Sequence, residues 1–462
     1  MQRTLKYLIL LLPLHAVAQG TAQGIAQDTA QVATQDTLSL AQCRQLALQN
    51  SEDIKIAERQ QQRTQAEKQA AFSHYLPKIS ASASLAYLFK DIDLSMDMSN
   101  VIPPAFQALM PSFVLPLDMS ARGAYMAGIR LEQPLFAGGK IVAGNRMASL
   151  GMAMADENAR MQRASTLAEV DKAYWVYVSV HEKIKILDKY DALLGRLDSS
   201  MQAGLSVDMM SEKDLLKVQS KRSSLAYDRL RAQHGLQLAR MALCRLVGKD
   251  FGSAITPADS SIFAPDVTAS AANDAPLSAD ISSRPEYRLM QHQVDINAQQ
   301  VKMTRADFLP TIGLGAGYNH LGGMKLAGQS KSFDMPFAMV TANIPLFHFG
   351  EGMRKIKSAR LQQDISAMEL EKNAKLLSLQ AQQAGLDWLD AQAQITVAND
   401  ALRLANEDLR VSRAAYETSL GTLIEYLDAQ AQWQQAYSNL IEARAACKIR
   451  ETEYFRAVGT LE

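Results

Sequence analysis

The architecture of this chain can be read outward from one segment, Tyr125-Met126-Ala127-Gly128-Ile129-Arg130-Leu131-Glu132-Gln133-Pro134-Leu135-Phe136-Ala137-Gly138-Gly139. Apolar residues stand at every second position from 125 to 131, with Arg130 and Glu132 falling between them. Such alternation predicts a strand with one apolar face. Pro-Leu-Phe follows the strand, and beyond the two glycines a long helical pattern begins. The segment is therefore a junction between a strand and a long helix.

Landmarks of this junction return later in the chain. Pro134-Leu135-Phe136 recurs as Pro345-Leu346-Phe347, an offset of 211 residues (345 − 134). The same offset relates two further pairs of motifs: Asp214-x-Leu216-x-x-Gln219 with Glu425-x-Leu427-x-x-Gln430, and Arg245-x-Val247-Gly248 with Arg456-x-Val458-Gly459. A constant offset is typical of packed helices rather than loops. We therefore expect two internal repeats, 39–249 and 284–460, joined by a Pro/Ser/Ala/Asp-rich linker at 250–283.

The two repeats differ in one place. Tyr75-Leu76-Pro77 recurs as Phe308-Leu309-Pro310 with a larger offset of 233 residues (310 − 77). The first repeat therefore holds 22 additional residues (233 − 211) between its Leu-Pro and Pro-Leu-Phe landmarks. We place them in an enlarged loop at about 91–119, which is rich in Pro and Met.

The N-terminus is predicted to be a secretory signal over residues 1–18. Arg3 and Lys6 supply positive charge, Tyr7–Leu14 an apolar run, and Ala16-Val17-Ala18 a small-residue cleavage site. The apolar run is far shorter than the ~20 residues of a membrane-spanning helix. The Gln/Ala/Thr-rich stretch at 19–38 has no apolar period, and we expect a flexible leader there.

Composition narrows the functional classes. Lys+Arg and Asp+Glu both number 48, so the net charge is zero and no nucleic-acid surface is indicated. Aromatic residues make up only 6% of the chain, which suits long helices with wet faces better than one packed core. The three cysteines, Cys43, Cys244 and Cys447, lack metal-ligand spacing. We expect small buried side chains at these positions.

Four runs of sequence alternate with a period of two, at 79–89, 125–131, 312–318 and 338–343. Their alternation is that of a tilted membrane strand of ~9–11 residues with apolar side chains outward. A half-buried sheet in a soluble domain would have the same pattern. Four strands in one chain leave two open edges, which lipid does not tolerate. Closure then requires several chains, and three chains would supply twelve strands.

Heptad patterns predict long helices at 139–207 and 350–418, with return helices at 211–247 and after Gly421. Ordinary core packing also produces heptad stripes, so the architecture has to decide between the two interpretations. The first long helix would span ~100 Å at ~1.5 Å per residue. A helix predicted at 41–76, stacked end to end with 211–247, would match that length. These proportions indicate a wall of continuous and broken helices side by side.

The chain resembles the TolC-like outer-membrane efflux protein family over roughly residues 39–460. The resemblance rests on the two Leu-Pro strand starts, the two Pro-Leu-Phe exits and the turn Ser419-Leu420-Gly421-Thr422-Leu423-Ile424-Glu425-Tyr426-Leu427-Asp428-Ala429-Gln430. It implies a mainly α fold with a small β part, in which a trimeric twelve-strand outer-membrane β-barrel continues into a twelve-helix periplasmic α-barrel. It also implies a homotrimer that contacts outer-membrane lipid, a periplasmic membrane-fusion adaptor and an inner-membrane transporter of the RND, ABC or MFS type.

The implied function is a passive gated channel of a tripartite efflux or type I secretion system in the outer membrane of a Gram-negative bacterium. Its cargo would be small molecules such as drugs, and a protein-secretion duct or a metal-cation efflux duct is the alternative. Four methionines of the enlarged loop bear on the metal alternative because thioethers favour Cu(I): Met96, Met98, Met110 and Met119. A mobile apolar loop is the other explanation for them.

The resemblance also implies functional positions at the two helical turns. Glu425 and Asp428 match the family's acidic constriction, and Tyr416 matches a gating tyrosine. Gly421 stands where some members carry an Arg that latches the closed tip, so the latch chemistry is open here. In the turn of the first repeat, Asp208 replaces the usual Gly.

The acidic residues can also be interpreted without the resemblance. Glu425 and Asp428 lie three apart on one helical face just after a turn, and Asp214 is the first-repeat counterpart of Glu425. Three copies would put six carboxylates from Glu425 and Asp428 around a narrow opening, favouring cations and raising some of their pKa values. The alternative is a pair of solvated acidic residues near a helix start, stabilised by the helix dipole.

No enzyme or cofactor site is indicated by the sequence. Beyond the predicted signal the histidines are scattered, at His74, His181, His234, His292, His320 and His348, and no HExxH, GxSxG or P-loop spacing occurs. A structural coiled-coil or adhesive surface protein is a further class, but it would not need four alternating strands delivered in matched pairs.

Overall fold

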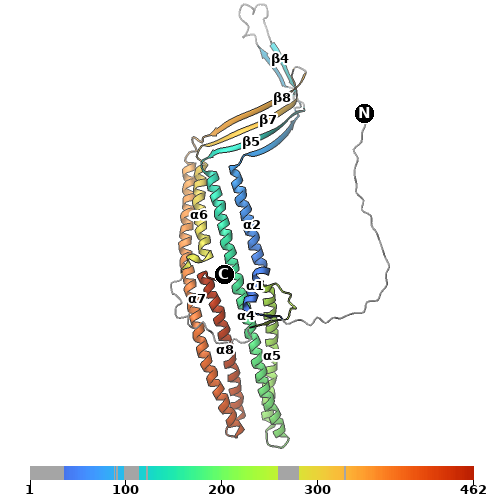
Figure 1. The fold of residues 1–462 in the computed structure, drawn as a ribbon, viewed down its shortest axis with the longest axis vertical. Helices are drawn as coiled ribbons and strands as arrows, with labels where there is room; N and C mark the ends of the chain where they lie inside the picture. The colour runs from blue at the N-terminus through green and yellow to red at the C-terminus, as the bar shows by residue number, and fades with distance from the viewer. Residues whose placement is uncertain are drawn as a thin grey trace, which may run out of the picture.

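The computed structural model describes residues 36–87, 89, 92–97, 114–120, 123–258, 280–326 and 329–461. The predicted signal at 1–18 and most of the predicted leader lie outside the described residues, as does the middle of the predicted linker, 259–279. The described chain is elongated, with a strongly tilted sheet at one end and long helices running away from it (Figure 1).

Two helices run the length of the helical part (Figure 1). They are α4 (Lys140–Leu205), with 66 residues, and α7 (Glu351–Glu417), with 67 residues. Two helices of 36 residues each fold back along them, α5 (Glu212–Val247) on α4 and α8 (Leu423–Val458) on α7. The predicted long and return helices are confirmed, with ends within two residues of those expected.

Shorter helices complete the wall near the sheet. α2 (Glu52–Phe72) packs on α4 above α5, and α6 (Pro285–Ala306) packs between α4 and α7 above α8 (Figure 1). The expected wall of continuous and broken helices is therefore present. Among the helices that the structure describes, none combines the length and the apolar character needed to cross a membrane.

The prediction of one helix at 41–76 is wrong. α1 (Leu40–Asn50) ends and α2 begins after Ser51, whose ψ of 128° is extended, and a 3₁₀ turn at Ser73–Tyr75 follows α2. Tertiary contact explains the break, because the Asn50 side-chain amide donates to the Val247 carbonyl at 3.0 Å. Gly248 has a left-handed φ of +72°, and a Cβ there would lie 2.5 Å from that of Asn50. The chain thus bends around the end of α5.

The predicted leader and linker each contribute a short strand, so both predictions need correction at their ends. β1 (Asp36–Leu38) pairs in parallel with β6 (Ile255–Pro257). The Tyr177 hydroxyl donates to the Ile255 carbonyl at 2.6 Å, which fixes this pair against α4. A 3₁₀ turn (Ile281–Ser283) ends the linker region. Runs of three residues are too short to show a period, and burial against α4 rather than local sequence orders them.

The four predicted strands form one antiparallel sheet. β2 (Lys78–Ala86), β5 (Ala124–Ala137), β7 (Thr311–Leu326) and β8 (Gln329–Asn343) are hydrogen-bonded in the order β2-β5-β7-β8. Among the described residues, β2 pairs only with β5 and β8 only with β7, so both are edge strands.

The enlarged loop predicted at 91–119 is partly a hairpin extension. β3 (Ile92–Asp97) pairs with β4 (Val114–Ser120), and β4 also pairs with the end of β7. β3 thus continues the line of β2, and β4 that of β5, beyond the end of the sheet (Figure 1). The alternation in Ile92-Asp93-Leu94-Ser95-Met96 predicts such a strand, but the neighbouring prolines favoured a loop. Met98 and Met110 lie outside the described residues.

Strand register gives the sheet two chemically different faces. Ile79, Leu131, Ala316 and Ala338 stand opposite one another on one face, and Lys78, Glu132, Gly315 and Met339 on the other. Every residue of β2 is exposed, as is nearly all of β8, so no part of the described chain covers the apolar face. Exposed aromatic side chains bound this face near the helices at Tyr75 and Phe136 and at its far end at Tyr87 and Tyr125.

Separate clusters of side chains, rather than one core, hold the helices together. One cluster joins α1, α4 and α5 around Tyr174 and Tyr177 and includes Cys43 and Cys244. Another joins α7 and α8 around Trp388 and includes Cys447. All three cysteines are buried, as predicted, and none of them forms a disulfide.

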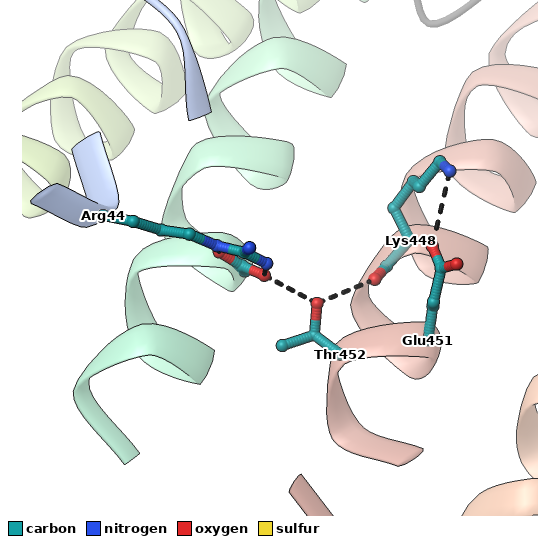
Figure 2. Close-up of polar contacts among 5 residues, drawn as sticks. Arg44, Lys448, Glu451 and Thr452 are labelled. Atoms are coloured by element: carbon teal, nitrogen blue, oxygen red, sulfur yellow. Dashed lines mark hydrogen bonds and ion pairs between the residues drawn. The ribbon is translucent and has the colours of Figure 1, made fainter. Parts of the chain in front are cut away.

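A polar junction ties three helices together at mid-length. Asp171 of α4 is completely buried and accepts a hydrogen bond from Arg44 Nε of α1 at 2.7 Å. Its other oxygen contacts the second guanidinium branch and accepts from the Thr452 hydroxyl of α8 at 2.7 Å. Figure 2 shows Arg44 and Thr452 approaching from opposite sides, with Lys448 and Glu451 on the same helix as Thr452. The junction links the first helical hairpin to the second.

Replacing Arg44 by Met would leave the Asp171 carboxylate with the Thr452 hydroxyl alone. We expect the free energy of unfolding to fall by about 2–3 kcal/mol, less than the ~3–5 kcal/mol of a fully buried pair, because the Arg44 side chain is 38% exposed. Thermal unfolding in detergent, followed by circular dichroism, measures this. Arg44→Met combined with Asp171→Leu is the control and should recover stability, and a double variant no more stable than the single one would contradict the prediction.

Candidate functional site

The two interhelical turns lie at the end of the molecule opposite the sheet (Figure 1). They share one hydrogen-bond pattern: Met209 N–H donates to the Gly204 carbonyl, and Leu420 N–H to the Ala415 carbonyl, both at 2.8 Å. This is the Schellman pattern of helix C-termini, which requires one left-handed residue. That residue is Asp208 in the first turn (φ +58°) and Ser419 in the second (φ +59°).

The left-handed conformation accounts for Asp208. Glycine is the usual residue in this conformation because it lacks a Cβ, and Asp is among the few others that tolerate it. Asp208 is exposed at the tip, so its carboxylate is in solvent. Its counterpart is Ser419, which the sequence analysis did not single out as a special position.

A positive φ does not explain the glycine at position 421, because Gly421 is not among the residues with positive φ. A Cβ at Gly421 would lie 3.0 Å from the Ala415 Cβ. In the first turn the sizes are exchanged: Met210 occupies the position of Gly421, and a Cβ on Gly204 would lie 2.4 Å from Met210 Cγ. Each turn therefore pairs one larger and one smaller residue, and a long side chain at 421 would first have to displace Ala415.

Tyr416 lies in the contact between the two hairpins. Its ring stacks on Tyr426 with centroids 5.5 Å apart and an interplanar angle of 18°. Burial raises the pKa of Tyr416, and the negative charge of Asp214 raises it further. Asp214 itself forms an ion pair with Lys217 at 2.9 Å. The structure thus brings together Tyr416 of α7 and Asp214 of α5.

A tip cluster of apolar side chains surrounds this contact. It joins α4 and α5 to the start of α8 and consists of Leu187, Tyr190, Leu194, Leu197, Met201, Val218, Leu225, Leu423, Tyr426 and Leu427. Tyr416 and Trp433 pack against it. The two turns are therefore one packed unit within the chain.

Glu425 caps the helix that it begins. The Thr422 N–H donates to Glu425 Oε2 at 2.8 Å, and the Glu425 N–H donates to Thr422 Oγ1 at 3.3 Å, which together form a capping box. These bonds to Thr422 lower the pKa of Glu425. Within one chain this matches the helix-start interpretation, whereas a raised pKa would need carboxylates from other copies. The Thr-x-x-Glu spacing is the sequence signal that predicts such a box.

Asp428 has a different environment from Glu425. It is exposed one turn further along α8. Burial together with the negative charge of Asp428 raises the pKa of Tyr190 on α4 to about 12. Asp428 therefore faces α4 across the hairpin contact, while Glu425 folds back on its own helix end. No cluster of three or more His, Cys, Asp or Glu that could hold a metal occurs among the described residues.

Comparison with known proteins identifies the class. The model of the family described as "Outer membrane efflux protein" matches residues 43–249 and 277–460, and the chain belongs to this family. Outer membrane protein OprJ of Pseudomonas aeruginosa is 24% identical over 363 residues, which cover 74% of this chain and 73% of OprJ. Alkaline protease secretion protein AprF of the same species is 20% identical over 70% of this chain and 66% of AprF.

Solved structures agree on the fold. The outer membrane protein VceC of Vibrio cholerae has a TM-score of 0.69 at 15% identity, covering 91% of this chain and 96% of VceC. The CmeC outer membrane channel of Campylobacter jejuni has a TM-score of 0.70 at 17% identity, covering 97% of this chain and 95% of CmeC. The chain is accordingly a TolC-like outer-membrane duct component for efflux or type I secretion, and not an enzyme. Its family works with a periplasmic adaptor and an inner-membrane pump.

The capping box predicts a pH dependence at the start of α8. Because the folded-state pKa of Glu425 lies below its ordinary 4.5, the cap is at full strength above pH 4.5 and is lost as pH falls through the lower, folded value. Hydrogen exchange of peptides covering 418–426, corrected for its intrinsic pH dependence, should show α8 fraying in acid. Glu425→Gln keeps the acceptor without the titration, and an unchanged pH dependence in that variant would refute the assignment.

Proposed function

We propose that three copies of this chain close into a gated ring that passes small molecules, such as drugs, across the periplasm and the outer membrane. One observation carries the proposal: at every level the described chain has two open edges, one on each side. Such an edge-to-edge contact joins different surfaces of neighbouring copies, and repeating it by rotation gives a closed ring.

The sheet supplies the first pair of edges. β2 and β8 each leave one row of backbone N–H and C=O groups without a partner among the described residues. The uncovered apolar face with aromatic side chains at both ends is the pattern of a membrane barrel. Backbone groups cannot stay unpaired in hydrocarbon, so β2 of one copy would pair with β8 of the next. Four strand positions per chain and three chains give the twelve-strand barrel.

The helices supply the other edges. Contacts give the lateral order α7-α8-α4-α5 in the lower half and α2-α4-α6-α7 in the upper half, so α7 is an edge throughout. α7 carries exposed apolar side chains along its length: Met353, Leu361, Ile365, Met368, Leu376, Leu379, Leu386, Val397, Leu404 and Val411. The opposite edge, α5, exposes Leu216, Tyr227, Leu230 and Leu238. Packing α7 of one copy against α2 and α5 of the next would give twelve helices at each level.

The matched halves favour a duplicated origin for residues 39–249 and 284–460. Their long helices differ by one residue in length, their return helices are equal, and their turns share one hydrogen-bond pattern. A signal peptide at 1–18 and a leader at 19–38 would deliver the chain to the periplasm.

The gate of the proposed duct is the tip. In a ring of three, Glu425 and Asp428 would form an acidic constriction, with Asp208 and Asp214 on the neighbouring turns. The tip cluster, against which the Tyr416 ring of the second hairpin packs, would hold the two hairpins of each copy together when the tip is closed. Because Gly421 is packed against Ala415, this apolar and aromatic contact, rather than an arginine latch, would keep it closed.

The names of similar proteins support the proposed class of cargo and type of pump. Matches include a toluene efflux pump outer membrane protein and an antibiotic efflux pump outer membrane protein, both from Pseudomonas putida, which favours small organic cargo delivered by an RND, ABC or MFS pump. The match to AprF, named for alkaline protease secretion, favours protein secretion as the second candidate. Purification of the chain with its adaptor and pump would separate the two.

The edge-to-edge ring predicts the oligomeric state. Native mass spectrometry in detergent should give three times the chain mass for the wild type. Leu404→Glu with Val411→Glu would place charges on the apolar edge of α7 and should give monomers or unstable trimers. Arg403→Glu, next to Leu404 but in an exposed pair with Asp400, is the control and should stay trimeric. A wild-type monomer would overturn the proposal.

The acidic gate predicts cation block. Glu425→Gln with Asp428→Asn should weaken block by hexamminecobalt(III), added at the tip side of channels in planar bilayers, by at least about ten-fold, because the charges vanish while the helix cap keeps an acceptor. Thr422→Ala removes the capping hydroxyl but keeps both charges, so it is the matched control and should be blocked like the wild type. Equal block of the double variant and the wild type would refute the constriction.

A further inference from the structure

A cavity of about 820 Å³ lies where the polar face of the sheet meets the tops of α2, α4 and α6. Its volume falls within the ~300–1,000 Å³ range of small-molecule sites. Strands β2, β5, β7 and β8 all contribute to its lining, so it depends on the sheet register rather than on one loop. None of the residues named at the tip takes part in it.

One wall of the cavity is apolar. β7 has glycine at 313, 315 and 317, and this row leaves room for the larger side chains of β8. A Cβ on Gly317 would lie 2.9 Å from the Phe337 ring, and one on Gly315 would lie 3.2 Å from Met339 Cγ. Phe337 and Met339 therefore lean over the β7 backbone and present a flat apolar surface.

The part of the lining formed by β2 and β5, on the same face of the sheet, is cationic. Lys78 of β2 and Arg130 of β5 line it together with a single acidic residue, Glu132, which lies 3.4 Å from Arg130. Lys78 has no ion pair within the described part of the chain. Lys140 also lines the cavity, but Asp307 neutralises it at 2.7 Å. The strand wall therefore carries one more positive than negative charge.

Strand register determines on which face of the sheet the cavity lies, and therefore which molecules can enter it. Lys78, Glu132 and Met339 share the face opposite to Ile79, Leu131 and Ala338, the apolar face directed at lipid. In the ring proposed above, on which this step rests, the cavity opens to the interior of the duct. Membrane lipid would therefore contact the apolar face of the sheet and not the cavity. Transported molecules would contact the face that lines the cavity.

We infer that this cavity binds amphipathic organic anions at the base of the barrel. The apolar body of such a molecule lies on Phe337 and Met339, and its sulfonate, carboxylate or phosphate lies between Lys78 and Arg130. Each copy of the chain contributes a complete site. The site favours anionic cargo at the point where the helical tunnel widens into the barrel, in contrast to the acidic tip.

Equilibrium dialysis of 1-naphthalenesulfonate against the protein in nanodiscs, with empty nanodiscs as the blank, tests this inference. Lys78→Gln with Arg130→Gln should lower the affinity at least about ten-fold. Glu132→Gln should raise it several-fold, because Arg130 is released from its carboxylate partner. Phe337→Ala should lower it several-fold. A merely destabilised barrel would not bind more tightly, so the gain with Glu132→Gln excludes a folding artefact.

Two controls complete the experiment. Lys375→Gln removes an exposed cation of α7 far from the cavity and should leave the affinity unchanged. Neutral 1-naphthalenemethanol should bind more weakly and should not respond to the charge variants. A trimeric protein whose affinity for the sulfonate is unaffected by Lys78→Gln with Arg130→Gln, or by Glu132→Gln, refutes the site alone. A chain that forms no trimer refutes the ring instead.

Discussion

Unpaired backbone groups at a sheet edge are the constraint on which this structure depends. β2 and β8 each leave half of their N–H and C=O groups without partners in the described chain, on a sheet whose apolar face is exposed. Water could satisfy these groups, but hydrocarbon cannot, at a cost of several kcal/mol for each group. In the proposed ring, neighbouring copies would pair with both edges and satisfy these groups.

The helices of a single chain also leave apolar side chains uncovered at their edges. Small clusters hold the helices of one chain together two or three at a time, and the described residues form no common core. The apolar side chains left exposed lie mainly on α5 and α7, the two lateral edges, rather than on the broad surfaces of the wall. The buried Asp171 junction joins the two hairpins at mid-length, and the tip cluster joins them again at the end. Each chain is therefore internally packed, and its two lateral edges expose apolar side chains.

Much of the fold could be predicted from the sequence because long elements repeat their pattern many times. The helical pattern of apolar residues recurs many times along the 66-residue helix α4, and the constant offset of 211 residues relates the first interhelical turn to the second. What could not be predicted depends on tertiary contact: the break at Ser51, the three-residue strands β1 and β6, and the hairpin extension β3–β4. At the tip the sequence located Glu425, and the Thr-x-x-Glu spacing predicts its bond to Thr422, whereas the left-handed Ser419 gave no composition signal.

The continuity of α7 has a mechanical consequence. Its 67 residues contain no proline, so the helix acts as one rod of about 100 Å between the tip and the base of the sheet. A tilt of about 1° around one end displaces the other by about 1.7 Å, from the same length. In the proposed ring, α7 would border the neighbouring copy along its whole length, so a small rotation at the barrel end would become a sideways step of atomic size at the entrance in every copy.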